Sequence, residues 1–335
     1  MSFALPDENL FLDLSDRTLL RLTGADRLRF LNGQVSNDVR RATVEEAVYT
    51  GVMTIKGKLC ADAFVRVDGE SLLVDAAPEL RESLAARLEK YIIADDVQVE
   101  DVSDGLGLFH LLDFYDHPER DAAAPSLPPA LAALGAGVRG VRASRLGRPG
   151  LDVFFEAALD EAVRAAIHQA RYTELNEDAL LSLRVLMGVP QWGAELDENV
   201  LPAEAGIEDR AVSFSKGCYI GQEVVSRVRS VGHVNRSLRG LKATDASPLY
   251  PGMQLYATGD AGGKAVGRIT SAAASAGHGG AAFVALGYVR REHAAAGTLL
   301  DAVAPPDDAS AAGNGSLDEA PPPPCRVEVC DLPFV

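Results

Sequence analysis

The chain has 335 residues, of which 47% are hydrophobic and 24% charged, and its formal net charge is −16. These values are typical of a globular protein that divides into two or three compact units. The acidic average surface argues against wholesale binding to nucleic acid or anionic membranes, and leaves room for a local basic groove. Met1 to Leu14 shows no secretory signal, and no stretch approaches the ~18 apolar residues of a membrane span. We therefore expect a cytoplasmic protein without membrane contact.

The N-terminal part of the chain mixes strands and helices. Apolar alternation predicts strands over 17–23, 48–55, 59–67, 71–74 and 97–102. The turn Lys56-Gly57-Lys58 makes a hairpin of the second and third of these strands. Helical spacing of apolar residues predicts helices over 26–31 and 78–92. This order lacks the regular βαβ alternation of a doubly wound sheet, so the sequence predicts an α+β fold.

Between these elements and residue 187 the sequence predicts one loop and two helices. Residues 116–137 are rich in Pro, Ala and Asp and are expected to form a surface loop or hinge. Helical patterns follow over 159–170 and 176–187. Asn176 is the expected N-cap of the second helix.

From about residue 235 the composition predicts a second domain, 235–335, after a first region 1–234. Its short strands are broken by Gly and Pro, which is typical of a small β-barrel. Residues 304–324 include four consecutive prolines and are expected to be a disordered insert. Residues 326–329 are expected to return as an edge strand.

The four cysteines are Cys60, Cys218, Cys325 and Cys330. None belongs to a Cys-x-x-Cys pair, which argues against a structural zinc site and a four-cysteine iron–sulfur cradle. A disulfide scaffold is not expected in a long chain with so few cysteines. The sequence therefore predicts no metal site.

The most informative segment is the octapeptide 216–223, which we call the signature loop. It reads Lys216-Gly217-Cys218-Tyr219-Ile220-Gly221-Gln222-Glu223. If a helix starts at Gly221, the thiol of Cys218 lies beside a helix N-terminus, where a thiolate is favoured. The alternative is a small buried hydrophobic residue, since free cysteines are often buried. We favour a functional thiol.

The segment after the signature loop is basic, in contrast to the acidic chain. From Lys216 to Lys242 there are six Lys or Arg residues and one acid, Glu223. Guanidinium groups suit anions such as a small molecule with several carboxylates or RNA phosphates. A solvated charged face is the alternative explanation. The candidate anion-binding residues are Arg227, Arg229, Arg236 and Arg239.

The signature loop resembles the signature of the YgfZ family, folate-binding relatives of the glycine-cleavage T-protein. Blocks at 23–39, 56–62, 183–190 and 201–204 resemble further blocks of that family in the same order. The resemblance implies a T-protein-like fold, with two α+β subdomains around a central folate-binding opening and a C-terminal β-barrel. It implies tetrahydrofolate or a related folate as cofactor. It also implies a role in iron–sulfur cluster assembly or repair that indirectly supports tRNA thiomethylation.

The same resemblance assigns site residues. It makes Cys218 the functional thiol, and it places Lys58, Asp62, Arg184 and Gly188 at the folate. Further candidates for ligand contact are Gly33, Gln34 and Asn37, which helix termination and loop packing explain equally well. Trp192, the only tryptophan, could stack on a pterin, although we favour an aromatic core residue.

Two departures from the T-protein pattern concern catalysis. Ala61 stands where the T-protein has one of two adjacent aspartates, and Leu186 stands where it has the glutamate that anchors the pterin. Leucine cannot accept hydrogen bonds from a pterin, and leaving those donors unpaired costs ~1–3 kcal/mol. We therefore do not expect a complete aminomethyltransferase.

The leading prediction is a folate-binding accessory protein whose partners are iron–sulfur client or assembly proteins. One alternative is a folate-dependent aminomethyl or one-carbon transferase of the T-protein type. The other is a tRNA-binding module that uses the basic stretch 227–239. Direct tRNA binding is the less favoured of these, because the chain as a whole is acidic.

Overall fold

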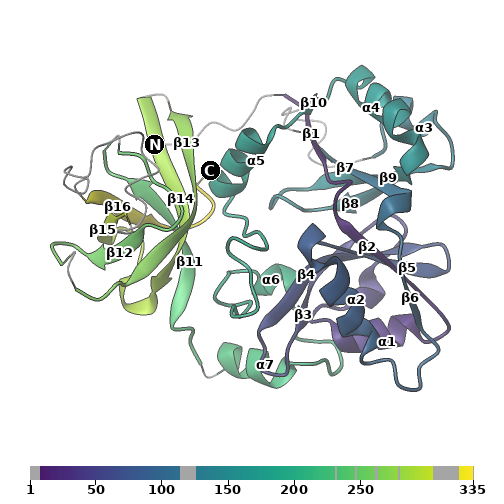
Figure 1. The fold of residues 1–335 in the computed structure, drawn as a ribbon, viewed down its shortest axis with the longest axis horizontal. Coiled ribbons are helices and arrows are strands. Elements are labelled where there is room, and N and C mark those ends of the chain that lie inside the picture. Colours follow the sequence, from purple (N-terminus) through teal and green to yellow (C-terminus); the bar gives the residue numbers. More distant parts are fainter. Residues whose placement is uncertain are drawn as a thin grey trace.

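The structure is a computed structural model that describes residues 8–113, 126–230, 232–245, 247–260, 263–277, 280–304 and 324–334. The described residues form two open five-stranded sheets and one closed barrel. In Figure 1 the barrel lies at one end of the molecule and the two open sheets lie at the other. No helix in the described ranges is long and apolar enough to cross a membrane.

The first open sheet is antiparallel and has the strand order β3-β4-β5-β2-β6. Its strands are β2 (Thr18–Thr23), β3 (Val48–Met53), β4 (Leu59–Asp68), β5 (Ser71–Ala76) and β6 (Gln98–Asp101). The accompanying helices are α1 (Arg27–Gln34), α2 (Arg81–Glu89) and the short 3-10 turns η1 (Val39–Arg41), η2 (Pro78–Leu80) and η3 (Ser103–Gly105). The helices cover one face of the sheet, where Leu31, Leu84 and Leu88 share a buried core with Ala61 of β4.

The second open sheet has the order β10-β1-β7-β9-β8, with a parallel β1–β10 pair and antiparallel pairs elsewhere. Its strands are β1 (Leu10–Asp13), β7 (Leu106–Leu112), β8 (Val138–Ala143), β9 (Gly150–Glu156) and β10 (Thr173–Glu174). Its helices are α3 (Pro129–Ala132), α4 (Asp160–Gln169) and the turn η4 (Ala157–Leu159). Val163 and Ile167 of α4 are buried against Phe11, Phe109 and Phe155.

The barrel closes in the order β11-β14-β13-β12-β15-β16. Its elements are β11 (Arg236–Ala243), β12 (Gln254–Ala257), β13 (Gly267–Gly277), β14 (Gly280–Arg290), the turn η5 (Arg291–His293), β15 (Leu299–Val303) and β16 (Cys325–Cys330). Leu241, Leu255, Val289, Leu300 and Val327 fill its interior. Closure leaves no free edge on β16, which pairs with both β11 and β15.

Three helices connect the second sheet to the barrel: α5 (Glu177–Leu186), α6 (Glu208–Ala211) and α7 (Gln222–Ser230). Asn176 caps α5, since its side chain accepts a hydrogen bond from the amide of Ala179 at 2.8 Å. Figure 1 shows α5 between the barrel and the second sheet, and α7 beside the β3–β4 hairpin.

The α+β class and the C-terminal barrel expected from the sequence are confirmed. The expectation that 326–329 forms an edge strand is wrong, because β16 closes the barrel by pairing with β11. The expected hinge 116–137 contains α3, and its part up to residue 125 lies outside the described residues. The expected disordered insert 304–324 lies outside them too, except for its two end residues.

Candidate functional site

The signature loop is anchored by its first residue. The ammonium of Lys216 donates hydrogen bonds to the carbonyls of Asn32, Val35 and Asn37, at 2.6, 2.8 and 2.8 Å. These carbonyls lie in and just after the last turn of α1, where a helix leaves its own acceptors unused. Burial lowers the pKa of Lys216 to about 8, against the opposing effect of Asp38. Lys216 therefore holds the loop to α1 and is not available to an external anion.

Gly221 brings the end of the loop against the β3–β4 turn. Its φ of +86° is a left-handed conformation, and an added Cβ would lie 2.5 Å from the carbonyl oxygen of Thr54. From the other side, Gly57 of that turn has a φ of +71°, and its added Cβ would lie 2.9 Å from the Cβ of Val224. Helix α7 starts at Gln222, one residue after Gly221, close to the start expected from the sequence.

Cys218 is exposed between two anchored neighbours. Lys216 is 6% and Tyr219 7% exposed, whereas Gly217 and Cys218 face solvent. Burial raises the pKa of Tyr219 to about 12, and its hydroxyl has no hydrogen-bond partner among the described residues. The alternative of a small buried cysteine is wrong, because the fixed neighbours present this thiol to solvent.

The four arginines of the basic stretch do not form one cluster of free cations. Each has a carboxylate or an aromatic ring of its own. The contacts are Arg227 with Glu223 at 2.6 Å, Arg229 over the ring of Phe214 at 3.9 Å, Arg236 with Glu204 at 3.3 Å, and Arg239 with Asp331 at 2.8 Å. The charge count of the sequence therefore overstates the cationic surface that is open to RNA.

A cavity of about 480 Å³ lies where α5, α6, β11 and the segment after β16 meet. We call it the junction cavity. Its wall consists of residues 187–190, 205–207, 238–239 and 331–333, together with Gly147 and Arg210. The volume lies in the range of small-molecule and cofactor sites.

Two glycines let the segment 331–334 form one side of the junction cavity. An added Cβ at Gly188 would lie 2.7 Å from the Cβ of Leu332, and one at Gly240 would lie 2.7 Å from the ring of Phe334. The amide of Phe334 donates to the carbonyl of Leu186 at 2.9 Å. Side chains larger than hydrogen at these glycines would displace the segment and reshape the cavity.

Of the predicted folate-binding residues, Gly188 lines the junction cavity and Arg184 does not. Arg184 is 5% exposed and pairs with Glu195 at 2.7 Å, and it also donates to the hydroxyl of Ser271 in β13. It therefore connects α5 to the barrel. Lys58 is half-buried in the β3–β4 turn, where its main chain bonds to Thr54.

Asp62 does not line the junction cavity and is linked to its wall through Tyr49 and Arg210. Its carboxylate accepts a hydrogen bond from the hydroxyl of Tyr49 at 3.1 Å. The guanidinium of Arg210, which lines the cavity, lies 5.2 Å from the centre of the Tyr49 ring. Burial raises the pKa of Asp62, against the opposing effect of Arg17.

The other candidates serve the core. Ala61 is fully buried in the core between the first sheet and its helices, and Leu186 is buried where α5 packs on the barrel. Trp192 packs against both of these cores, as an aromatic core residue.

The side chain of Asn37 donates to the carbonyls of Tyr49 and Arg210, at 2.8 and 2.9 Å. Gln34 accepts from Arg87 at 3.1 Å. Loop packing thus accounts for both polar side chains.

The interface between the two open sheets contains a buried ionic network. Asp75 accepts hydrogen bonds from Arg17 and Arg145, and Asp152 accepts from Arg145 and from Nδ1 of His110, both at 2.7 Å. Burial lowers the pKa of His110, against the opposing effect of Asp152. Burial alone would raise the pKa of Asp152, but Arg145 and His110 hold it well below its usual range.

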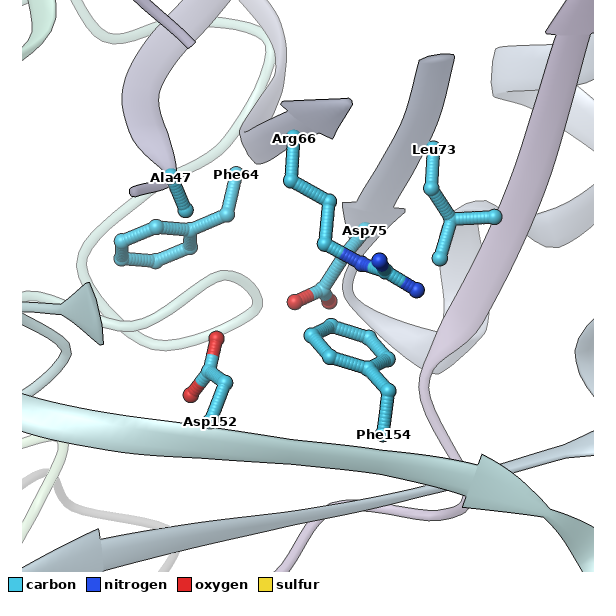
Figure 2. A pocket seen from close by; sticks show the side chains of 7 residues that line it. All are labelled: Ala47, Phe64, Arg66, Leu73, Asp75, Asp152 and Phe154. Atoms are coloured by element: carbon cyan, nitrogen blue, oxygen red, sulfur yellow. The ribbon is translucent and has the colours of Figure 1, made fainter. Parts of the chain in front are cut away.

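Aromatic rings complete this interface. Figure 2 shows Phe64, Arg66, Asp75, Asp152 and Phe154 converging on a narrow pocket. The guanidinium of Arg66 lies 3.8 Å from the centre of the Phe154 ring, and that of Arg145 lies 4.4 Å from the Phe64 ring. The pocket has no room for a water molecule. This pocket between the two sheets is therefore filled by side chains, whereas the junction cavity beside the barrel has room for a small molecule.

Sequence reasoning missed Arg210 and the segment 331–333 as cavity residues. Neither stands in a recognisable motif, and their position depends on contacts between distant parts of the chain. Within the described ranges, no three His, Cys, Asp or Glu side chains come together as metal ligands would.

The architecture places the chain in the class of T-protein-like folds. It superposes on the glycine cleavage system aminomethyltransferase T from Bartonella henselae with a TM-score of 0.78 and 19% identity, covering 98% of this chain and 86% of that one. The expected T-protein-like fold is thereby confirmed. No family model matches the sequence.

Two relatives define the chain more closely. It is 29% identical over 276 residues to an iron–sulfur cluster assembly factor IBA57 homologue, mitochondrial, from Neosartorya fischeri, covering 74% of this chain and 60% of that protein. It is 25% identical over 235 residues to the tRNA-modifying protein YgfZ of Yersinia pestis, covering 68% of this chain and 69% of that protein. The chain is thus similar in sequence to YgfZ and IBA57 proteins. It spans about three fifths of the length of the IBA57 relative.

Proposed function

We propose that this chain is a cytoplasmic folate-binding accessory protein of iron–sulfur cluster assembly or repair. The junction cavity is the observation that carries the proposal: a T-protein-like fold has an open cavity of about 480 Å³ beside its α5, α6 and β11 elements. Tetrahydrofolate or a related folate is the proposed cofactor. Its ring system would lie on apolar wall residues such as Met187, Val189 and Leu238.

The exposed thiol of Cys218 is the second part of the proposal. Cys218 is not among the residues that line the junction cavity. We therefore assign ligand binding to the cavity, and action on an iron–sulfur client or assembly protein to the thiol. Support for tRNA thiomethylation would be indirect, through the iron–sulfur enzymes that carry it out.

An aminomethyltransferase activity is not part of this proposal. Ala61 and Leu186 replace carboxylates of the T-protein pattern, and both side chains are buried in apolar cores. Of the carboxylates of that pattern named above, only Asp62 is kept, and it does not line the cavity. A tRNA-binding module has less support, because the chain as a whole carries a formal net charge of −16, which repels phosphate.

Calorimetric titration with tetrahydrofolate under anaerobic conditions tests the binding part. We expect wild type and Cys218→Ala to bind with the same affinity, because the thiol lies outside the cavity wall. Met187→Trp, which enlarges a half-buried residue of that wall, should weaken binding at least about tenfold. Equal binding by Met187→Trp and wild type would exclude the junction cavity as the folate site.

Complementation tests the thiol part. A bacterial strain that lacks its own YgfZ would receive wild type, Cys218→Ala or Met187→Trp, with tRNA thiomethylation as the readout. We expect wild type to restore the modification and both variants to fail, although Cys218→Ala still binds folate in vitro. Full restoration by Cys218→Ala would remove the thiol from the proposal.

A further inference from the structure

Three charged side chains lie in the wall of the junction cavity: Arg210, Arg239 and Asp331. Arg239 is the only one of the four arginines of the basic stretch that lines it. Arg210 is engaged elsewhere, since it donates to the carbonyl of Ser144 and lies over the ring of Tyr49. The guanidinium of Arg239 is therefore the cation of this wall that is best placed to meet a ligand.

Arg239 is paired with Asp331 in a contact that solvent reaches. The distance from Nη1 of Arg239 to Oδ1 of Asp331 is 2.8 Å, and the two side chains are 31% and 75% exposed. Ion pairs with this exposure contribute little to stability and exchange readily for another anion. Nε of Arg239 has no hydrogen-bond partner in the part of the chain that the structure describes. An arginine with five N–H donors thus uses few of them here.

The position of Asp331 does not depend on that ion pair. The neighbouring segment is held by the hydrogen bond from the amide of Phe334 to the carbonyl of Leu186, and by Leu332 lying against Gly188. Opening the pair would leave the Asp331 carboxylate at the rim of the cavity. A ligand carboxylate and Asp331 would then compete for the same guanidinium.

We infer that Arg239 is the subsite for the glutamate carboxylates of the folate, and that Asp331 occupies it as an internal competitor while the cavity is empty. This inference rests on the proposed function. A folate combines a flat ring system with a dianionic glutamate tail, which matches a wall of apolar residues that ends in an arginine. Asp331 sets the affinity for the tail and leaves the affinity for the ring system unchanged.

The test compares two ligands by anaerobic calorimetry. Tetrahydrofolate carries the glutamate tail, and 6-methyltetrahydropterin carries the reduced ring system with no carboxylate. Asp331→Asn removes the competitor and should tighten tetrahydrofolate binding about threefold, since an exposed ion pair is worth at most about a factor of five. Its affinity for 6-methyltetrahydropterin should stay at the wild-type value. The matched control is Asp104→Asn, which opens the exposed Arg81–Asp104 pair far from the cavity wall and should change neither affinity.

Arg239→Gln should weaken tetrahydrofolate binding about tenfold and leave 6-methyltetrahydropterin binding unchanged. When Asp331→Asn is combined with Arg239→Gln, it should no longer raise the affinity for tetrahydrofolate, because both residues act on the same ligand carboxylate. The inference is overturned if wild type binds tetrahydrofolate and neither single variant changes that affinity, or if both ligands respond equally. The proposed function survives that result. Failure of wild type to bind tetrahydrofolate would instead remove the proposed function.

Discussion

The two-sheet interface and the junction cavity both contain arginine–aspartate pairs, yet the pairs differ in exposure. In the interface the side chains of Arg145 and Asp152 are 7% and 1% exposed, and in the cavity wall those of Arg239 and Asp331 are 31% and 75% exposed. A buried pair cannot open without leaving a charge stripped of water, whereas an exposed pair opens at little cost. We infer that the buried pairs fix the relative position of the two open sheets, whereas the exposed pair in the cavity wall can rearrange when a ligand binds.

The signature loop repeats this contrast over three residues. The buried ammonium of Lys216 satisfies three carbonyls, and the thiol of Cys218 faces solvent two residues later. The first residue fixes the position from which the second can act.

The largest effect is expected from breaking the buried network. Asp152→Ala leaves Arg145 with one fewer carboxylate in a site closed to water, which should lower the free energy of unfolding by about 3–5 kcal/mol. Urea unfolding followed by circular dichroism measures it. Asp104→Ala, which breaks an exposed pair with Arg81, is the control and should cost under about 1 kcal/mol. Equal losses in the two variants would contradict the contrast between buried and exposed pairs.

The next effect is a pH dependence due to Lys216. Its pKa is about 8 in the folded chain and ordinarily 10.5, so between these values the unfolded chain binds more protons and stability rises with pH. The free energy of unfolding should increase by about 2 kcal/mol more in wild type than in Lys216→Met from pH 7.5 to pH 9.5. Parallel pH profiles would mean that the three carbonyls hold the ammonium at its ordinary pKa.

Gly221→Ala tests the fit between the signature loop and the β3–β4 turn. The new Cβ would meet the carbonyl oxygen of Thr54 in a left-handed conformation, which should cost about 1–3 kcal/mol. Gly217→Ala is the matched control, because an added Cβ there meets nothing within 4 Å. Thermal unfolding of the two variants measures the difference. A Gly221→Ala protein as stable as the control would show that the turn and the loop can separate freely.

The smallest effect is expected at the cavity rim. Asp331→Ala opens an exposed pair, so the free energy of unfolding should change by less than about 0.5 kcal/mol. The same urea titration applies. If Asp331→Ala lowered the free energy of unfolding about as much as Asp152→Ala, the exposed pair in the cavity wall would be as important for stability as the buried pair between the sheets.

Local structure was largely predictable from the sequence. The β3–β4 hairpin, the Asn176 cap and the helix after Gly221 follow from alternation, capping preference and a glycine. These features depend on neighbours in the chain, so a sequence pattern carries them.

The partners of charged residues were not predictable. Lys216 adds to the positive charge of the segment 216–242, but its hydrogen-bond acceptors are main-chain carbonyls about 180 residues away in sequence. The pairing of β16 with β11, and of Asp331 with Arg239, requires closure of the barrel. Such contacts depend on register between distant strands, which no local spacing encodes. The resemblance supplied the fold but not the place of the cavity.

Trp192 offers an intrinsic optical probe of the whole assembly. As the only tryptophan, it packs against the core of the first sheet and against the core shared by α5 and the barrel. Its emission should therefore shift to the red as soon as these two bodies part, even while each keeps its secondary structure. Comparing that fluorescence with far-ultraviolet ellipticity would separate undocking of the barrel from melting of the sheets.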